Sequence, residues 1–295
     1  MLRHALSKLA AVLMHLASVQ GTHAAEKWQV FTPPPPMPVA DESGLADVNG
    51  IRMYYAIYGK GRGNPILLVH GGMGTGDVWG FEVPRLSEHH EVIVADSRGH
   101  GRSTRTDAPY TYHMMAEDYV ALLDKLKEPK VSLVGWSDGA IIGLDIAMNH
   151  PDHLAKLFAH AANVTPDGLN DDPDMTALTA AGARDETEYK RLSPTPDDFS
   201  NFKAAIQKLW ATEPNYTAAD LGKITVPTEI VVGDHDEFIL PEHSRYIASA
   251  IPGAKLVILK DVSHLAIYQD PDQYIKAVED FVDGDGASAT NASTP

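Results

Sequence analysis

Cysteine is absent from this chain of 295 residues. Without its sulfur atom, disulfides, thiolate zinc sites, cysteine nucleophiles and lipoprotein anchors are all excluded. A chain of this length can bury one large core without such crosslinks. The absence therefore removes several classes of functional site without weakening the case for a globular fold.

Basic residues are scarce. The 24 Lys and Arg residues stand against 40 Asp and Glu residues, which gives a formal net charge of −16. A surface of this sign repels nucleic acid and anionic membranes and favours solubility. We therefore expect neither as a partner. Net charge does not identify the substrate, because a site sets its own local field. The sequence also contains no signal from which an oligomeric state can be derived.

Long apolar runs are also missing. The run Leu9–Val19 is too short to span a bilayer as a permanent anchor. It follows a basic start with Arg3 and Lys8 and precedes small residues that end at Ala24, a pattern typical of an export signal. We expect residues 1–24 to be a signal peptide and the protein to be periplasmic or secreted in a bacterium. The alternative is an amphipathic N-terminal helix of a cytosolic protein.

Two further segments lack apolar periodicity. Residues 25–44 contain the run Thr-Pro-Pro-Pro-Pro-Met-Pro at 32–38, which predicts a stiff proline-rich linker. A peptide-recognition role is the alternative for this run. Residues 284–295 are small and polar, which predicts a disordered tail. The expected domain is therefore 45–283.

Within that domain, short apolar runs alternate with segments of helical period. Continuous apolar runs are typical of buried parallel strands, because helices cover both faces of the sheet. Asn49-Gly50 supplies a tight turn for a hairpin between Ala46 and Tyr58. The alternation predicts an α/β fold with a mostly parallel, twisted sheet of about eight strands and helices on both faces. The expected parallel strands are 66–69, 92–95, 131–134, 157–161, 229–232 and 256–259.

The alternation breaks once, between about residues 167 and 222. This segment is rich in Asp, Thr and Pro and has helical stretches but no strand signal. We expect a small helical cap over the active end of the sheet. The alternative is a long connection packed at its side.

The sequence Gly135-Trp136-Ser137-Asp138-Gly139 lies between an expected strand and an expected helix. A serine on such a sharp turn projects its hydroxyl above the sheet, and the flanking glycines avoid collisions in the tight turn. The pentapeptide alone is a weak signal, but the strand–turn–helix context makes Ser137 the candidate nucleophile.

A serine hydroxyl needs a base, and the base needs a carboxylate that orients it. Among 14 histidines, His264 follows the last expected strand and so lies at the carboxyl edge, where parallel sheets bind ligands. His243, on an expected helix, is the reserve candidate. The loop after the penultimate strand offers Asp234 and Asp236. We favour Asp236, because the residue deeper in the turn can reach the final loop, and the order Ser–Asp–His is typical of this strand–turn–helix arrangement.

The negative charge that develops on a substrate carbonyl oxygen requires hydrogen-bond donors. We expect the amide of Asp138, at the start of a helix, and an amide from the loop His70–Gly74, from Gly72 or else Met73. Taken alone, this loop could equally be a phosphate cradle or a simple turn. The expected substrate-binding side chains are Trp136, Trp210, Phe238 and Leu240.

Together these segments resemble the α/β-hydrolase superfamily from about Leu45 to Val282. The resemblance rests on His-Gly-Gly-Met-Gly at 70–74, Asp-Ser-Arg-Gly-His-Gly-Arg-Ser at 96–103, the serine turn, Gly-Asp-His-Asp at 233–236 and the final Ser-His. It implies the α/β-hydrolase fold and a purely structural role for 96–103. Trp136 and Asp138 resemble those of biphenyl-hydrolase-like proteins, in which the acid after the serine is implicated in holding a substrate amine.

The sequence therefore predicts a serine hydrolase that cleaves a carboxylic ester, or a related acyl bond of a small molecule, through an acyl-enzyme. This chemistry needs no cofactor, and no metal-ligand spacing is present. A serine at the turn argues against the haloalkane dehalogenases and epoxide hydrolases of this fold, which use an aspartate there. The alternatives are an amino-acid ester hydrolase or aminopeptidase, a cofactor-free perhydrolase and, least favoured, a non-catalytic binding protein on the same fold.

Overall fold

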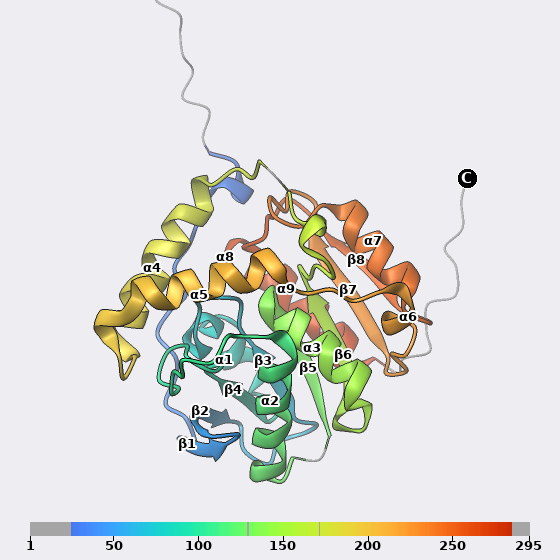
Figure 1. Cartoon of the computed structure of the whole chain (residues 1–295). Helices are drawn as coiled ribbons and strands as arrows, with labels where there is room; N and C mark the ends of the chain where they lie inside the picture. The colour runs from blue at the N-terminus through green and yellow to red at the C-terminus, as the bar shows by residue number, and fades with distance from the viewer. Residues whose placement is uncertain (1–24, 129, 171, 285–295) are drawn as a thin grey trace, which may run out of the picture.

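The computed structural model describes residues 25–284 apart from 129 and 171. The expected signal peptide, and the expected tail beyond Gly284, lie outside the described residues. An eight-stranded sheet in the order β1-β2-β4-β3-β5-β6-β7-β8 forms the centre of the molecule (Figure 1). The strands are β1 (Glu42–Val48), β2 (Ile51–Tyr58), β3 (Ile66–Val69), β4 (Val92–Ala95), β5 (Val131–Trp136), β6 (Leu154–His160), β7 (Thr228–Gly233) and β8 (Lys255–Leu259).

The sheet is mostly parallel. Strands β4, β3, β5, β6, β7 and β8 pair in parallel, whereas β1 pairs with β2, and β2 with β4, in antiparallel register. The β1–β2 turn uses Asn49 at φ 42° and Gly50 at φ 80°. Both residues accept the left-handed conformation that a two-residue hairpin requires. The expected fold class is thus confirmed.

Neighbouring residues of the central strands face opposite layers of the molecule. In β3, Leu67 and Val69 pack into one core cluster, whereas Ile66 and Leu68 pack into the other. The first face is covered by α2 (Tyr112–Leu126), α3 (Asp138–Asn149) and α7 (Pro241–Ala250). The second is covered by α1 (Glu82–Leu86), α8 (Ala266–Gln269) and α9 (Pro271–Asp283). Burial on both faces explains why these strands are continuous apolar runs.

The segment expected to be a cap contains α4 (Thr176–Leu192), α5 (Phe199–Thr212) and α6 (Ala218–Leu221). Helices α4 and α5 cross the carboxyl edge of the sheet, as Figure 1 shows. Helix α6 instead packs against α3 and α7, so it belongs to the flank of the sheet. The 3-10 turns are η1 (Lys27–Gln29), η2 (Gly76–Trp79), η3 (Pro151–His153), η4 (Pro166–Gly168) and η5 (Pro196–Asp198).

The proline-rich segment is docked on the domain and is not a free spacer. The Trp28 ring stacks on His235, with centroids 3.7 Å apart, and Phe31 meets Tyr268 edge-on at 5.1 Å. The sheet also begins at Glu42, three residues before the expected domain boundary. Aromatic partners thus hold a segment whose prolines alone indicated only stiffness.

Within the described part of the chain, none of the helices combines the length and apolarity needed to cross a bilayer.

Candidate active site

Ser137 lies on a strained turn between β5 and α3. Its backbone adopts φ 56° and ψ −120°, a conformation that a residue with a side chain rarely enters. The turn is also crowded. A Cβ on Gly139 would lie 2.1 Å from the carbonyl oxygen of Val69, and one on Gly135 would lie 2.4 Å from that of Gly139. Only glycine fits at these two positions, so the turn raises the serine hydroxyl above the sheet edge.

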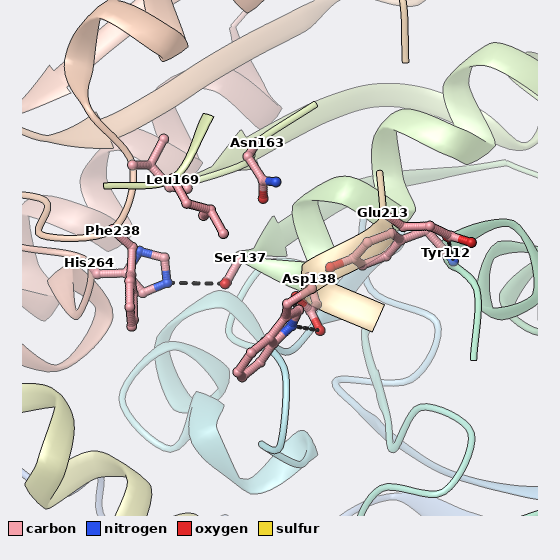
Figure 2. A pocket seen from close by; sticks show the side chains of 10 residues that line it. Tyr112, Ser137, Asp138, Asn163, Leu169, Glu213, Phe238 and His264 are labelled. Carbon is pink, nitrogen blue, oxygen red and sulfur yellow. Dashed lines mark hydrogen bonds between the residues drawn. The ribbon is translucent and has the colours of Figure 1, made fainter. Parts of the chain in front are cut away.

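The structure brings the three side chains singled out in the sequence into one hydrogen-bonded chain. Ser137 Oγ lies 3.0 Å from His264 Nε2 (Figure 2). His264 Nδ1 lies 3.1 and 3.2 Å from the two carboxylate oxygens of Asp236. Asp236 and His264 are each 5% exposed. A buried imidazole between a hydroxyl and a carboxylate can accept the hydroxyl proton on one nitrogen while it donates on the other.

Two amides fix the orientation of Asp236. Its Oδ1 accepts the backbone N–H groups of Phe238 (2.9 Å) and Ile239 (2.8 Å). Asp234, the alternative acid, points elsewhere and lies near His235 and Lys260. The geometry therefore favours Asp236 as the partner of His264.

Burial tends to lower the pKa of His264, but the charge and hydrogen bond of Asp236, with the charges of Glu237 and Asp138, raise it above its usual value. His243 does not take part. Its Nε2 accepts the backbone N–H of Val164 at 3.1 Å.

The glycine loop after β3 lies directly against the serine turn. A Cβ on Gly71 would lie 3.2 Å from Ser137 Cβ, and one on Gly72 would lie 2.6 Å from Asp138 Oδ2. Met73 adopts φ 63°, which turns the backbone sharply after the two glycines. The loop that carries the amides of Gly72 and Met73 therefore packs against the turn that carries Ser137 and Asp138, and the oxyanion role of these amides stays a prediction.

His70 is a structural residue of the same loop. Its Nδ1 donates to the carbonyl oxygen of Gly71 (2.7 Å), and its Nε2 accepts the N–H of Ser97 (2.9 Å). Asp96 is equally structural, since it accepts the amides of Gly76 and Arg102, both at 2.7 Å. These bonds join the loops after β3 and β4 and leave neither side chain free for chemistry.

A cavity of about 90 Å³ opens onto Ser137 and His264. Phe238 and Trp210 line it, as expected from the sequence. Trp136 and Leu240 do not. The Trp136 ring is buried, and its Nε1 donates to the carbonyl oxygen of His264 at 2.9 Å. Leu240 precedes α7 and is 43% exposed.

Sequence reasoning missed five lining residues, namely Tyr112, Asn163, Leu169, Glu213 and Ile239. Asn163 lies just past β6, so the rule that ligands bind at the carboxyl ends of parallel strands could have found it. The others come from α2, from the connection that leads into the cap, from the end of α5 and from the loop before α7. Only the tertiary structure brings them to this place.

Asp138 is a buried carboxylate in the cavity wall. Its Oδ1 accepts Tyr112 Oη–H and Trp210 Nε1–H, both at 2.9 Å, and Trp210 Nε1 also lies 3.1 Å from Oδ2 (Figure 2). Burial raises the pKa of Asp138 to about 6, against the opposing effect of these hydrogen bonds and of the charge of His264. Asp138 therefore changes its charge close to neutral pH.

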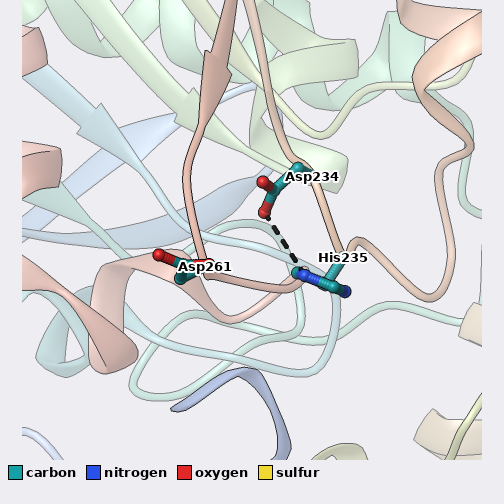
Figure 3. A group of neighbouring side chains, drawn as sticks. All are labelled: Asp234, His235 and Asp261. Atoms are coloured by element: carbon teal, nitrogen blue, oxygen red, sulfur yellow. Dashed lines mark ion pairs between the residues drawn. The ribbon is translucent and has the colours of Figure 1, made fainter. Parts of the chain in front are cut away.

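A second group of side chains lies at the outer end of β7. Asp234, His235 and Asp261 bring possible ligand atoms within 4.8 Å of one another (Figure 3). The His235 ring, however, is stacked on Trp28, and Lys260 Nζ lies 3.5 Å from Asp234. We assign no metal to this partly exposed cluster, because Asp234 already faces the Lys260 cation and the His235 ring is stacked on Trp28.

Comparisons with known proteins agree with this architecture. A model of the alpha/beta hydrolase family matches residues 66–277. The serine hydrolase BPHL of Homo sapiens is 27% identical over 258 residues, which cover 81% of this chain and 86% of the relative. A putative carbamate hydrolase, RutD, of Pseudomonas savastanoi pv. phaseolicola is 26% identical over 252 residues, which cover 74% and 93%. The enol-lactonase of Burkholderia xenovorans LB400 is 25% identical, with a TM-score of 0.66, over 81% of this chain and all of that one.

Proposed function

Since the chain belongs to the alpha/beta hydrolase family and is a hydrolase, we propose that it cleaves a carboxylic ester or a related acyl bond through an acyl-enzyme on Ser137. The observation that carries this proposal is the hydrogen-bonded chain from Ser137 through His264 to Asp236. The name of one relative is in keeping with it, because an enol-lactone is a cyclic ester.

The reaction proceeds in two steps. His264 Nε2 accepts the proton of Ser137 as Oγ attacks the substrate carbonyl, and the amides of Gly72 or Met73 and of Asp138 hold the resulting oxyanion. Collapse of this intermediate breaks the acyl bond, and Nε2 returns its proton to the leaving group. Water then loses a proton to Nε2 and attacks the acyl-serine, and Nε2 gives that proton to Ser137 Oγ as the acid is released. Asp236 accepts Nδ1–H throughout.

A second candidate within this chemistry is an ester or amide of an amino acid. Two carboxylate residues, Asp138 and Glu213, line the cavity, and among the described lining residues there is no lysine or arginine. A pocket of this charge favours an acyl group that carries an ammonium and disfavours one that carries a carboxylate. The resemblance of Asp138 to the amine-holding acid of biphenyl-hydrolase-like proteins supports the same candidate.

Turnover on a panel of chromogenic substrates tests the proposal. The panel contains p-nitrophenyl acetate, butyrate and octanoate, with p-nitrophenyl esters and p-nitroanilides of alanine and valine. Ser137→Ala should lose turnover by roughly a million-fold. The matched control is Ser249→Ala, which changes an exposed serine on α7 and should act as the wild type does.

The panel also separates the candidates. Preference for simple acyl esters supports the carboxylesterase, whereas preference for free-amine substrates supports the amino-acid ester hydrolase or, with anilides, an aminopeptidase. Peroxide-dependent turnover would indicate a perhydrolase. Turnover that survives in Ser137→Ala overturns the proposal, because another group would then be the nucleophile. A wild type that neither turns over the panel nor reacts with a phosphonate-ester probe also overturns it and leaves a binding protein.

A further inference from the structure

Glu237 follows Asp236 directly and connects the loops that carry two of the three site residues. Its carboxylate accepts the backbone N–H of His264 at 2.9 Å and the hydroxyl of Ser263 at 3.3 Å. The side chain is buried, with the residue 9% exposed. The loop after β7 is thereby fastened to the loop after β8 at the residue that bears the imidazole.

The second of these loops is held from its other side as well. Gln269 accepts the N–H of Ser263 at 2.7 Å and donates to Ser263 Oγ at 3.0 Å. Trp136 donates to the carbonyl oxygen of His264. The backbone N–H of His264 is thus bound by Glu237, the neighbour of Asp236, and its carbonyl oxygen is bound by Trp136, the neighbour of Ser137.

A buried carboxylate is costly unless it is paired or hydrogen-bonded. Burial raises the pKa of Glu237, against the charge of His264 and the His264 amide. A structural link alone could be made by a neutral glutamine, which offers the same acceptor. The charge itself therefore calls for an explanation, and the nearest cation that forms in the proposed reaction is the imidazolium of His264.

We propose that Glu237 is a positioning residue that fixes His264 against Asp236 and supplies a second negative charge that stabilises the imidazolium of His264. The inference rests on the proposed function, because the imidazolium forms when Ser137 gives up its proton. The titratable groups that face His264 are Asp236 and Glu237 from the loop after β7, Asp138 from α3 and His160 from the end of β6. Burial lowers the pKa of His160 to about 3, so His160 stays neutral and contributes no competing charge.

The decisive variant is Glu237→Gln, which keeps the shape and one acceptor oxygen but removes the charge. Loss of that charge lowers the pKa of His264, so the acidic limb of the kcat/KM profile should move down by about half a unit to one unit. Glu237→Ala also removes the link between the loops. It should lower kcat by about ten- to a hundred-fold with little change in KM.

The matched control is Asp234→Asn, which removes one carboxylate from the same loop without touching His264. Its acidic limb should stay at the wild-type position. A second measurement needs no turnover: the imidazole proton signals of His264 in a Ser137→Ala background report its pKa directly, with or without Glu237→Gln.

The outcomes separate the two proposals. A wild type whose activity depends on Ser137, together with an unshifted limb and an unshifted imidazole titration in Glu237→Gln, overturns the role of Glu237 alone. Activity that does not depend on Ser137 overturns the proposed function. The imidazole titration would still show whether the Glu237 charge acts on His264, also for a variant with too little activity for a profile.

Discussion

The indole of Trp136 donates its N–H to the carbonyl oxygen of His264 at 2.9 Å, across 128 positions of the sequence. The residue before the serine thus holds the backbone of the histidine, while its ring packs edge-on against Tyr268. Trp136 therefore supports the geometry between two site residues and does not form a wall of the cavity.

Trp136→Phe should separate these two roles. A smaller aromatic ring remains to pack against Tyr268, but the N–H and its hydrogen bond are lost, so His264 is held less firmly. We expect kcat to fall by about ten-fold, within the range seen for slightly misplaced groups, with KM nearly unchanged. Steady-state kinetics on the preferred ester measures both values. A raised KM with an intact kcat would instead return Trp136 to the substrate pocket.

Asp236→Asn should cost far more than Asp234→Asn. The asparagine keeps the shape of the side chain but no longer enforces the tautomer of His264, an effect that costs about ten-thousand-fold in kcat in a serine protease. Asp234 contacts His235 and Lys260 on the outer surface, so its replacement should leave kcat close to that of the wild type. Equal losses in both variants would contradict the assignment of the acid.

Asp138→Asn should stabilise the fold at neutral pH. The folded protein holds the Asp138 proton up to a pKa of about 6, against an ordinary value of 3.8. Between these values the folded state binds more protons than the unfolded state, so stability falls as the pH rises and stays reduced above about pH 6. The shift corresponds to roughly 2 to 3 kcal/mol.

Urea unfolding of the wild type and the variant at pH 4 and pH 7 measures this difference, because asparagine does not titrate and the variant should not show the fall in stability with pH that Asp138 causes. Tyr112 and Trp210 both reach Oδ1, which asparagine retains as an acceptor, and only the longer Trp210 contact with Oδ2 is lost. If the variant is less stable than the wild type at pH 7, the ionised carboxylate of Asp138 does not destabilise the folded state. Turnover of amine-bearing esters by the same variant tests whether the Asp138 charge is used to bind the ammonium group of a substrate.

Gly72→Ala should distort the site by a steric clash of the added methyl group. The added Cβ would lie 2.6 Å from both Asp138 Oδ2 and Trp210 Cζ2, so the loop or the cavity wall must move. We expect a loss of about a hundred-fold in kcat, similar to the loss of one oxyanion donor. Gly182→Ala on α4 is the control, because no atom beyond its chain neighbours and the backbone of its own helix lies within 4 Å of the new Cβ. It should leave the kinetics unchanged and raise stability slightly.

The local signals in the sequence predicted most of the sheet and singled out three side chains that the fold brings together at its edge. Strands β3 and β4 coincide with the expected runs, since burial on both faces leaves no polar position within them. Ser137, Asp236 and His264 could be singled out because each follows a strand within a few residues, where loops from distant parts of a parallel sheet converge.

What the sequence could not predict depends on the direction of side chains and on tertiary packing. Trp136 ends β5, where successive side chains point to opposite faces, and it points toward α8 and not toward the cavity. Tyr112 reaches Asp138 from α2 without any motif of its own. The helical stretches between 167 and 222 were visible, but the position of α6 against α3 and α7 was decided by packing.

The segment before β1 determines how much of the chain a recombinant protein should contain. Trp28 stacks on His235, the neighbour of Asp236, and its carbonyl oxygen accepts the side-chain N–H of Gln269 at 2.9 Å. Gln269 in turn holds Ser263, the neighbour of His264. The loops that carry Asp236 and His264 are thus both held by this segment, which a truncation to the expected domain 45–283 would remove. A recombinant version begun at Leu45 would keep every residue of the proposed chemistry and still lose part of what aligns them, so a purification tag is better placed at the carboxyl end.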